Sequence, residues 1–146
     1  MYGFFETTNI INLDLSPINF SKVTSMDSMF AHYGFLNIDL EKAGLRYNEV
    51  TITWPKSTTE ASYPAAGCVA DYMYCATSIA PNVLANWDGT KVTSARGMFL
   101  EYGWNTNYGL IKDDAKVEFP ENYKFADNCV CEFMFHQAKC AVDLSG

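Results

Sequence analysis

The chain has 146 residues, of which 49% are hydrophobic and 18% are charged, so it has the length and composition of one folded domain. Its seventeen acidic and ten basic residues give a net charge of −7, and a surface of that sign disfavours nucleic-acid binding. No apolar run approaches the roughly 18 residues that a membrane-spanning helix needs, and the first eleven residues contain neither Lys nor Arg, unlike a signal peptide.

The first elements predicted along the chain are a strand at residues 10–15 and a second strand at residues 35–40. In both, leucine or isoleucine alternates with polar residues, so the apolar side chains point to one face of a strand. The apolar residues between the two strands are three, four and three positions apart, the spacing of one face of a short helix: Val23, Met26, Phe30 and Tyr33. A strand, a turn and a helical turn therefore form the predicted structural unit.

The same unit occurs again later in the chain. Residues 22–34 recur at residues 91–103, where eight of the thirteen positions are identical. A shorter period is marked by an aromatic residue that follows an apolar one: Phe5, Phe30, Tyr74, Phe99 and Phe135. These markers are 25, 44, 25 and 36 residues apart, which we interpret as a 25-residue coil with insertions in alternate coils. The sequence therefore predicts a single repeat domain over residues 1–146.

A coil of this length cannot bury its apolar face alone, so neighbouring coils must stack. We therefore expect an α/β repeat fold, a short right-handed solenoid of about four coils with parallel strands along one side and insertions in two coils. The strands at residues 10–15 and 35–40 should be adjacent in the sheet. The five markers should stack as a buried aromatic ladder.

Three phrases of the first unit carry a resemblance to a known family: Leu-Asp-Leu-Ser at residues 13–16, Phe-Ser-Lys-Val-Thr-Ser-Met at 20–26, and Met-Phe at 29–30. The later copy has Trp-Asp at 87–88, Thr-Lys-Val-Thr-Ser at 90–94, and Met-Phe at 98–99. These phrases resemble the BspA-like branch of the leucine-rich repeats, which are 25-residue repeats of bacterial, mycoplasma and protist surface proteins. The resemblance implies a leucine-rich-repeat-like solenoid and a role in adhesion or binding. Members usually have many near-identical coils behind a secretion signal, whereas this chain has few.

No catalytic motif appears in the sequence, and we expect no enzyme activity, no cofactor and no bound metal. Cys129 and Cys131, with His136 and Cys140 nearby, have metal-ligand character, but the paired Cys residues of zinc fingers are spaced more widely. These thiols could be free, disulfide-bonded or metal-bound, and the sequence leaves this open. Asp14 suits calcium in principle, but a solvated or turn-capping carboxylate is the expected role.

Aromatic residues cluster after the marker pairs, in the same loops of successive coils, and form the predicted binding site: Tyr33, Tyr47, Tyr102, Trp104 and Tyr108. A row of rigid aromatic side chains along one edge suits recognition of a protein or a glycan. In the alternative interpretation, Trp104 faces inward and only the tyrosine hydroxyls are solvated.

The sequence thus favours a non-enzymatic protein-binding or glycan-binding adhesion module on a cell or virion surface. The alternative is a structural or decorating subunit of a larger assembly, for example a virus particle. We expect the open ends of the solenoid to be covered by a partner chain or by a second copy. We expect neither nucleic-acid binding nor membrane insertion.

Overall fold

The computed structural model describes residues 2–6, 10, 12–33, 51–56, 62–77, 79, 81–105, 110–111 and 116–143. Its regular elements are short: β1 (Asn12–Asp14), β2 (Thr51–Thr53), β3 (Cys68–Val69), the 3-10 helices η2 (Asn82–Ala85) and η3 (Gly89–Lys91), β4 (Val92–Ser94), β5 (Trp104–Asn105), β6 (Leu110–Ile111), β7 (Lys116–Glu118) and β8 (Ala141–Asp143). Most of the described chain between them is built from turns.

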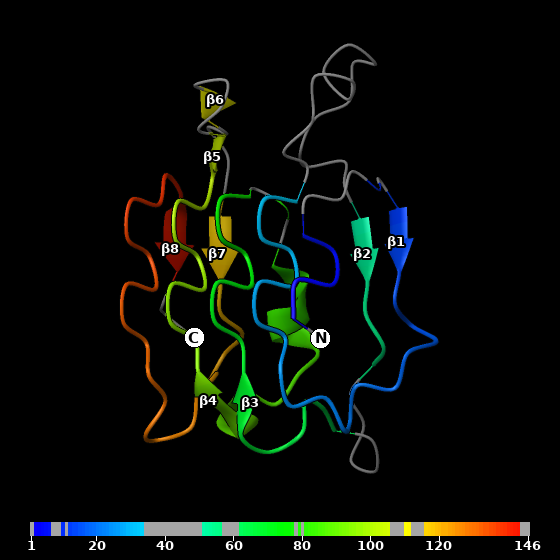
Figure 1. The fold of residues 1–146 in the computed structure, drawn as a ribbon. Helices are drawn as coiled ribbons and strands as arrows, with labels where there is room; N and C mark the ends of the chain where they lie inside the picture. Colours follow the sequence, from blue (N-terminus) through cyan, green and yellow to red (C-terminus); the bar gives the residue numbers. More distant parts are fainter. Residues whose placement is uncertain are drawn as a thin grey trace.

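The strands form separate two-stranded sheets. β1 pairs with β2, β3 with β4 and β7 with β8, each pair parallel, while β5 and β6 are antiparallel. Leu13 lies opposite Ile52 in the first sheet, and Val117 lies opposite Val142 in the last one. Figure 1 shows these two sheets at opposite sides of the molecule, with a 3-10 helical segment between β2 and β7.

The predicted leucine-rich-repeat-like solenoid of about four coils is wrong. The described residues contain no α-helix and no continuous parallel sheet, and β1 pairs with Thr51–Thr53. The predicted strand at residues 35–40 lies outside the described residues. Among the described residues, the sheet of β1 and β2 does not continue into a third parallel strand, because η2 lies beside β2. The Asn82 side chain donates to the carbonyl of Ile52 (2.7 Å) and accepts from the indole of Trp54 (3.0 Å), so η2 lies where a further strand would pair.

The predicted helix at residues 23–33 is a succession of tight turns. The N–H of Met29 donates to the carbonyl of Met26 (3.1 Å), and the N–H of Tyr33 donates to that of Phe30 (3.0 Å). The third residue of each turn has a left-handed backbone, with φ 53° at Ser28 and 53° at His32. A positive φ at that position is the geometry of a type II turn and is incompatible with a continuing helix.

We call a stretch of such turns a turn row, and each turn row contains one marker residue. The turn rows cover residues 2–6, 25–33, 69–77, 94–102 and 130–138. Figure 1 shows them side by side, from the blue N-terminal row to the orange row that precedes β8. Hydrogen bonds join each row to the next, for example from the N–H of Tyr74 to the carbonyl of Met98 (2.8 Å). The rows therefore pair as strands do, although their backbone is turned.

The predicted aromatic ladder is confirmed. Along the rows, successive marker rings are 5.7, 5.6, 5.7 and 5.2 Å apart between centroids, and their planes are within 22° of parallel. Phe30, Tyr74 and Phe99 are fully buried, whereas Phe5 and Phe135, in the two outermost rows, are partly buried.

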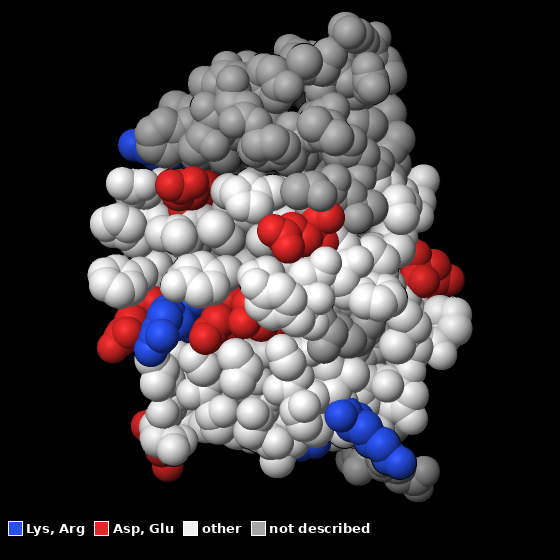
Figure 2. All heavy atoms as spheres, in the orientation of Figure 1, with Lys and Arg blue, Asp and Glu red and all other residues white. Residues whose placement is uncertain are grey.

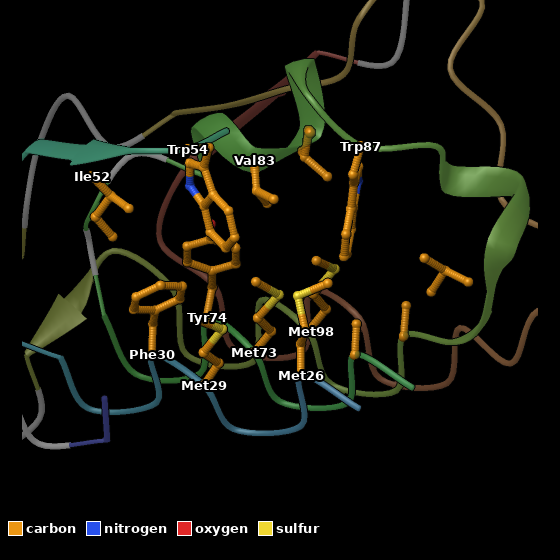
Figure 3. Packing of buried hydrophobic residues seen from close by; sticks show 14 of the residues in the cluster. Met26, Met29, Phe30, Ile52, Trp54, Met73, Tyr74, Val83, Trp87 and Met98 are labelled. Atoms are coloured by element: carbon orange, nitrogen blue, oxygen red, sulfur yellow. The ribbon is translucent and has the colours of Figure 1, made fainter. Parts of the chain in front are cut away.

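The core lies between the turn rows and the strands. Figure 3 shows methionines of the rows beside the marker rings, with Trp54, Val83 and Trp87 on the opposite side of the same cluster. The buried methionines precede the markers or stand four residues before them, so each row contributes one apolar edge to the core. Other side chains of the rows, such as Tyr72 and Arg96, are exposed on the opposite side from the core.

Candidate binding surface

The two predicted binding residues whose side chains the structure describes, Tyr33 and Tyr102, do not lie on the surface. Tyr33 and Tyr102 are each 1% exposed, and both belong to the core. The hydroxyl of Tyr33 donates to the carbonyl of Ile10, and that of Tyr102 donates to the carbonyl of Ile79 (2.8 Å). Burial raises the pKa of Tyr33 to about 12.

The side chains of the other three predicted binding residues lie outside the described part of the structure. Tyr47 and Tyr108 lie outside the described residues. Trp104 is in β5, but its side chain is outside the described part of the structure. The sequence argument therefore fails at the residues that can be checked, since the position three after the marker points inward.

The described structure exposes a different set of aromatic side chains, which the sequence interpretation missed: Tyr2 (74% exposed), Phe4 (61%), Tyr72 (36%) and Phe133 (65%). Tyr72 and Phe133 stand two residues before their markers, and Gly3 and Gly97 occupy the same position in other rows. From the first row to the last, this position holds Gly3, Ser28, Tyr72, Gly97 and Phe133, so the sequence already showed small residues in three rows and an aromatic residue in two.

The backbone at this position is left-handed in all of these rows. The φ values are 54° at Tyr72, 56° at Phe133, 54° at Gly3 and 56° at Gly97. Glycine adopts this conformation freely, whereas other residues have a penalty of about 1–2 kcal/mol. A methyl group on Gly97 would come within 2.5 Å of Cε1 of Tyr72, so the Tyr72 ring lies over Gly97 of the next row.

Charged side chains lie immediately before this position in the rows. One carboxylate oxygen of Asp71 accepts from the Ser94 hydroxyl (2.5 Å) and from the backbone N–H of Arg96 (2.8 Å). Nε of Arg96 is 3.2 Å from a carboxylate oxygen of Glu132. Figure 2 shows acidic and basic side chains in a line across the rows, next to a band of uncharged side chains. The turn face therefore combines exposed rings with charges of both signs.

A shallow groove of about 500 Å³ lies between η2 and β7. Its lining residues are Pro81, Asn82, Leu84, Ala85, Lys116, Glu118, Phe119 and Pro120. Lys116 and Glu118 form an ion pair with each other, and the Asn82 amide is engaged by Ile52 and Trp54. Its polar groups are thus already paired within the protein, which makes the groove a weaker candidate than the turn face.

The cysteine cluster does not assemble a metal site within the described residues, where no three His, Cys, Asp or Glu side chains converge. All five cysteines are free thiols. Burial raises the pKa of Cys68 to about 11 and also raises that of Cys129, so both thiols stay protonated at neutral pH. Asp14 has the turn-capping role that we expected, because its carboxylate accepts from the N–H of Ser16 (2.9 Å).

The comparisons with known proteins concern the N-terminal part of the chain. Residues 1–55 match a family described as Mycoplasma protein of unknown function, DUF285. That family is related to BspA-like repeat proteins. The chain matches no curated protein and no solved structure. Within the described residues, no helix has the length and apolar character to cross a membrane.

Proposed function

We propose that this chain is a non-enzymatic binding module that uses the exposed face of its turn rows to hold a protein or glycan ligand on a cell or virion surface. The observation that carries the proposal is the ring of Tyr72, which is exposed at a backbone position suited to glycine. The proposal goes beyond the match of residues 1–55, because that family has no described function.

Tyr72 is an unfavourable choice for stability alone. Its left-handed backbone has a penalty of about 1–2 kcal/mol relative to an ordinary conformation, and glycine would remove it. The equivalent residue of the next row is Gly97, which shows that the turn forms without a side chain there. Ser28 has the same left-handed backbone at the equivalent position of another row, so the turn itself requires no aromatic side chain. An exposed aromatic side chain at this position supplies rigid contact area for recognition.

The surroundings of Tyr72 suit a polar ligand with one flat apolar face. The ring supplies a rigid apolar surface with little conformational entropy to lose. Asp71 is the neighbour of Tyr72 in its own row, and the ion pair of Arg96 with Glu132 lies across the next two rows. A sugar ring, or a protein side chain flanked by polar groups, would contact the aromatic face and these charges together.

Binding to an array of neutral and sialylated glycans and to a panel of extracellular matrix proteins tests the proposal. We expect the chain to bind at least one member, and the Tyr72→Gly variant to bind at least tenfold more weakly. Lys22→Ala, which changes an exposed residue that precedes a row, is the matched control and should bind normally. Undiminished binding by Tyr72→Gly, or no binding to either panel, would contradict the proposal.

A second candidate function is a structural subunit of a larger assembly. It is favoured by a different observation, the backbone groups at the two outermost turn rows that have no backbone partner among the described residues. Edges of this kind are rarely left bare in native proteins.

A further inference from the structure

The two outermost turn rows present opposite hydrogen-bonding groups. Among the described residues, every backbone–backbone hydrogen bond that joins two turn rows runs from an N–H of one row to a carbonyl of the following row. The last row therefore has N–H groups at Phe133 and Phe135 without an acceptor among the described residues. In the first row, the carbonyls of Tyr2 and Phe4 accept no backbone hydrogen bond from the described part of the chain. One edge of the protein donates and the other accepts.

The two donors and the two acceptors at these edges also have the same spacing along the chain as the pairs inside the protein. Inside the protein, the N–H of Tyr72 donates to the carbonyl of Arg96 (2.9 Å), and the N–H of Tyr74 donates to that of Met98 (2.8 Å). Phe133 and Phe135 occupy the positions of the two donors in their row. Tyr2 and Phe4 occupy the positions of the two acceptors in theirs. The first row could thus follow the last row as the fourth row follows the third.

The side chains at these edges match in the same way. Inside the protein, an aromatic residue, Tyr72, lies over the glycine of the next row, Gly97. At the edges, Phe133 is 65% exposed, and the equivalent residue of the first row is Gly3. The atoms nearest to the position of a Cβ on Gly3 all belong to Glu6, so no ring of the described protein covers this glycine.

We propose that a second copy of this chain docks its first turn row on the last turn row of the first copy, so that copies associate head to tail. The N–H groups of Phe133 and Phe135 would donate to the carbonyls of Tyr2 and Phe4 of the second copy, and the ring of Phe133 would cover its Gly3. Contacts of this heterologous kind do not close on themselves, so they extend into a chain of copies. The inference does not depend on the ligand of the turn face.

Two further features of the edges support a second copy as the occupant. The partly buried rings of Phe5 and Phe135 are the ends of the aromatic ladder, and stacking one on the other would continue it across the contact. Glu6 and His136 both directly follow their markers, so a carboxyl group and an imidazole, which can share a hydrogen bond, would meet. A partner unrelated in sequence would have to reproduce the ring, the glycine and the hydrogen-bond spacing together.

Sedimentation velocity of the 146-residue chain between 5 and 200 µM tests the inference, with thermal unfolding as the check that each variant folds. We expect the wild type to form species larger than a monomer in proportion to concentration. Gly3→Phe would place a ring against the ring of Phe133 and should raise the dissociation constant at least tenfold. The fold should tolerate this variant, because Tyr72 and Phe133 occupy the equivalent position in their own rows.

Phe133→Gly should weaken association similarly, because glycine at both edges leaves the contact without its ring. The double variant Gly3→Phe with Phe133→Gly should recover association, because it restores one ring and one glycine with their places exchanged. The order of a glycine row followed by an aromatic row exists in the protein between Gly97 and Phe133. Tyr72→Gly, at the equivalent position of an inner row, should leave association unchanged.

A wild type that stays monomeric at 200 µM would overturn the inference. So would association that is unaffected by Gly3→Phe and Phe133→Gly, since another surface would then be responsible. A double variant that folds but does not recover association would show that the ring and the glycine do not meet. A dimer that does not grow further would indicate a closed contact and would also contradict the head-to-tail arrangement.

Discussion

Gly97→Ala tests the contact between Gly97 and the ring of Tyr72 on the turn face. Gly97 has φ 56°, and a Cβ there would lie 2.5 Å from Cε1 and 2.7 Å from Cδ1 of Tyr72. The left-handed backbone contributes about 1–2 kcal/mol of destabilisation, which is offset by about 0.4–1 kcal/mol because alanine restricts the unfolded chain. Displacement of the ring adds about 1–3 kcal/mol, as in other overpacked sites. We expect the free energy of unfolding to fall by about 2–4 kcal/mol in total.

Gly67→Ala is the matched control for the backbone effect. Gly67 has φ 79°, and a Cβ there would meet no atom within 4 Å. The free energy of unfolding of this variant should fall by only about 1 kcal/mol, since alanine has the left-handed penalty here without a steric clash. The difference between the two variants isolates the contact with the Tyr72 ring.

Urea unfolding of Gly97→Ala, Tyr72→Gly and the double variant completes the measurement. We expect a coupling free energy of about 1–3 kcal/mol, because the methyl group at residue 97 no longer meets a ring when residue 72 is glycine. If Gly97→Ala cost no more than Gly67→Ala, or if the two changes were additive, the ring of Tyr72 would not lie over Gly97.

Three other outcomes can be measured. In urea unfolding, Phe99→Ala should lower the free energy of unfolding by about 3–5 kcal/mol. Phe135→Ala should lower it by less than half as much, since Phe135 is at the edge of the ladder and only partly buried. Losses below about 1 kcal/mol at both positions would contradict a buried ladder. At pH 8, a thiol reagent should modify the exposed Cys131 well before Cys68, whose pKa burial raises to about 11, and equal rates would show that Cys68 is accessible. The pKa of Tyr33 is about 12 in the fold and about 10 when unfolded, so the unfolded chain loses this proton first. The contribution of Tyr33 to stability should therefore be constant below pH 10 and be lost between pH 10 and 12, and Tyr33→Phe should reduce the fall of stability in that range.

The repeat and its markers could be read from the sequence. The marker residues recur after 25 residues, or after a longer interval where a coil carries an insertion, and each is preceded by an apolar residue, so both must face the same core whatever backbone carries them. The aromatic ladder from Phe5 to Phe135 follows from that requirement alone. The strand β1 also lies within the predicted residues 10–15, because Leu13 alternates with polar neighbours.

The backbone of the rows was decided by tertiary structure. A spacing of three, four and three residues fits a helix, but it fits successive four-residue turns equally well, and the sequence does not distinguish them. The turns prevail because each row can then donate its N–H groups to the next row, as Phe30 does to Met73, which a helix would use within itself.

The binding residues were misplaced because a cluster of aromatic residues was interpreted as a surface row. Tyr33 shares its apolar spacing with the marker Phe30, and the structure buries both Tyr33 and Tyr102 in the core. The exposed position is instead the left-handed residue two places before the marker, occupied by Tyr72 and Phe133. The sequence by itself determined which residues must pack together. Which of the others face solvent depends on the sign of φ at single turn residues, and the stacking of one row on the next sets that sign.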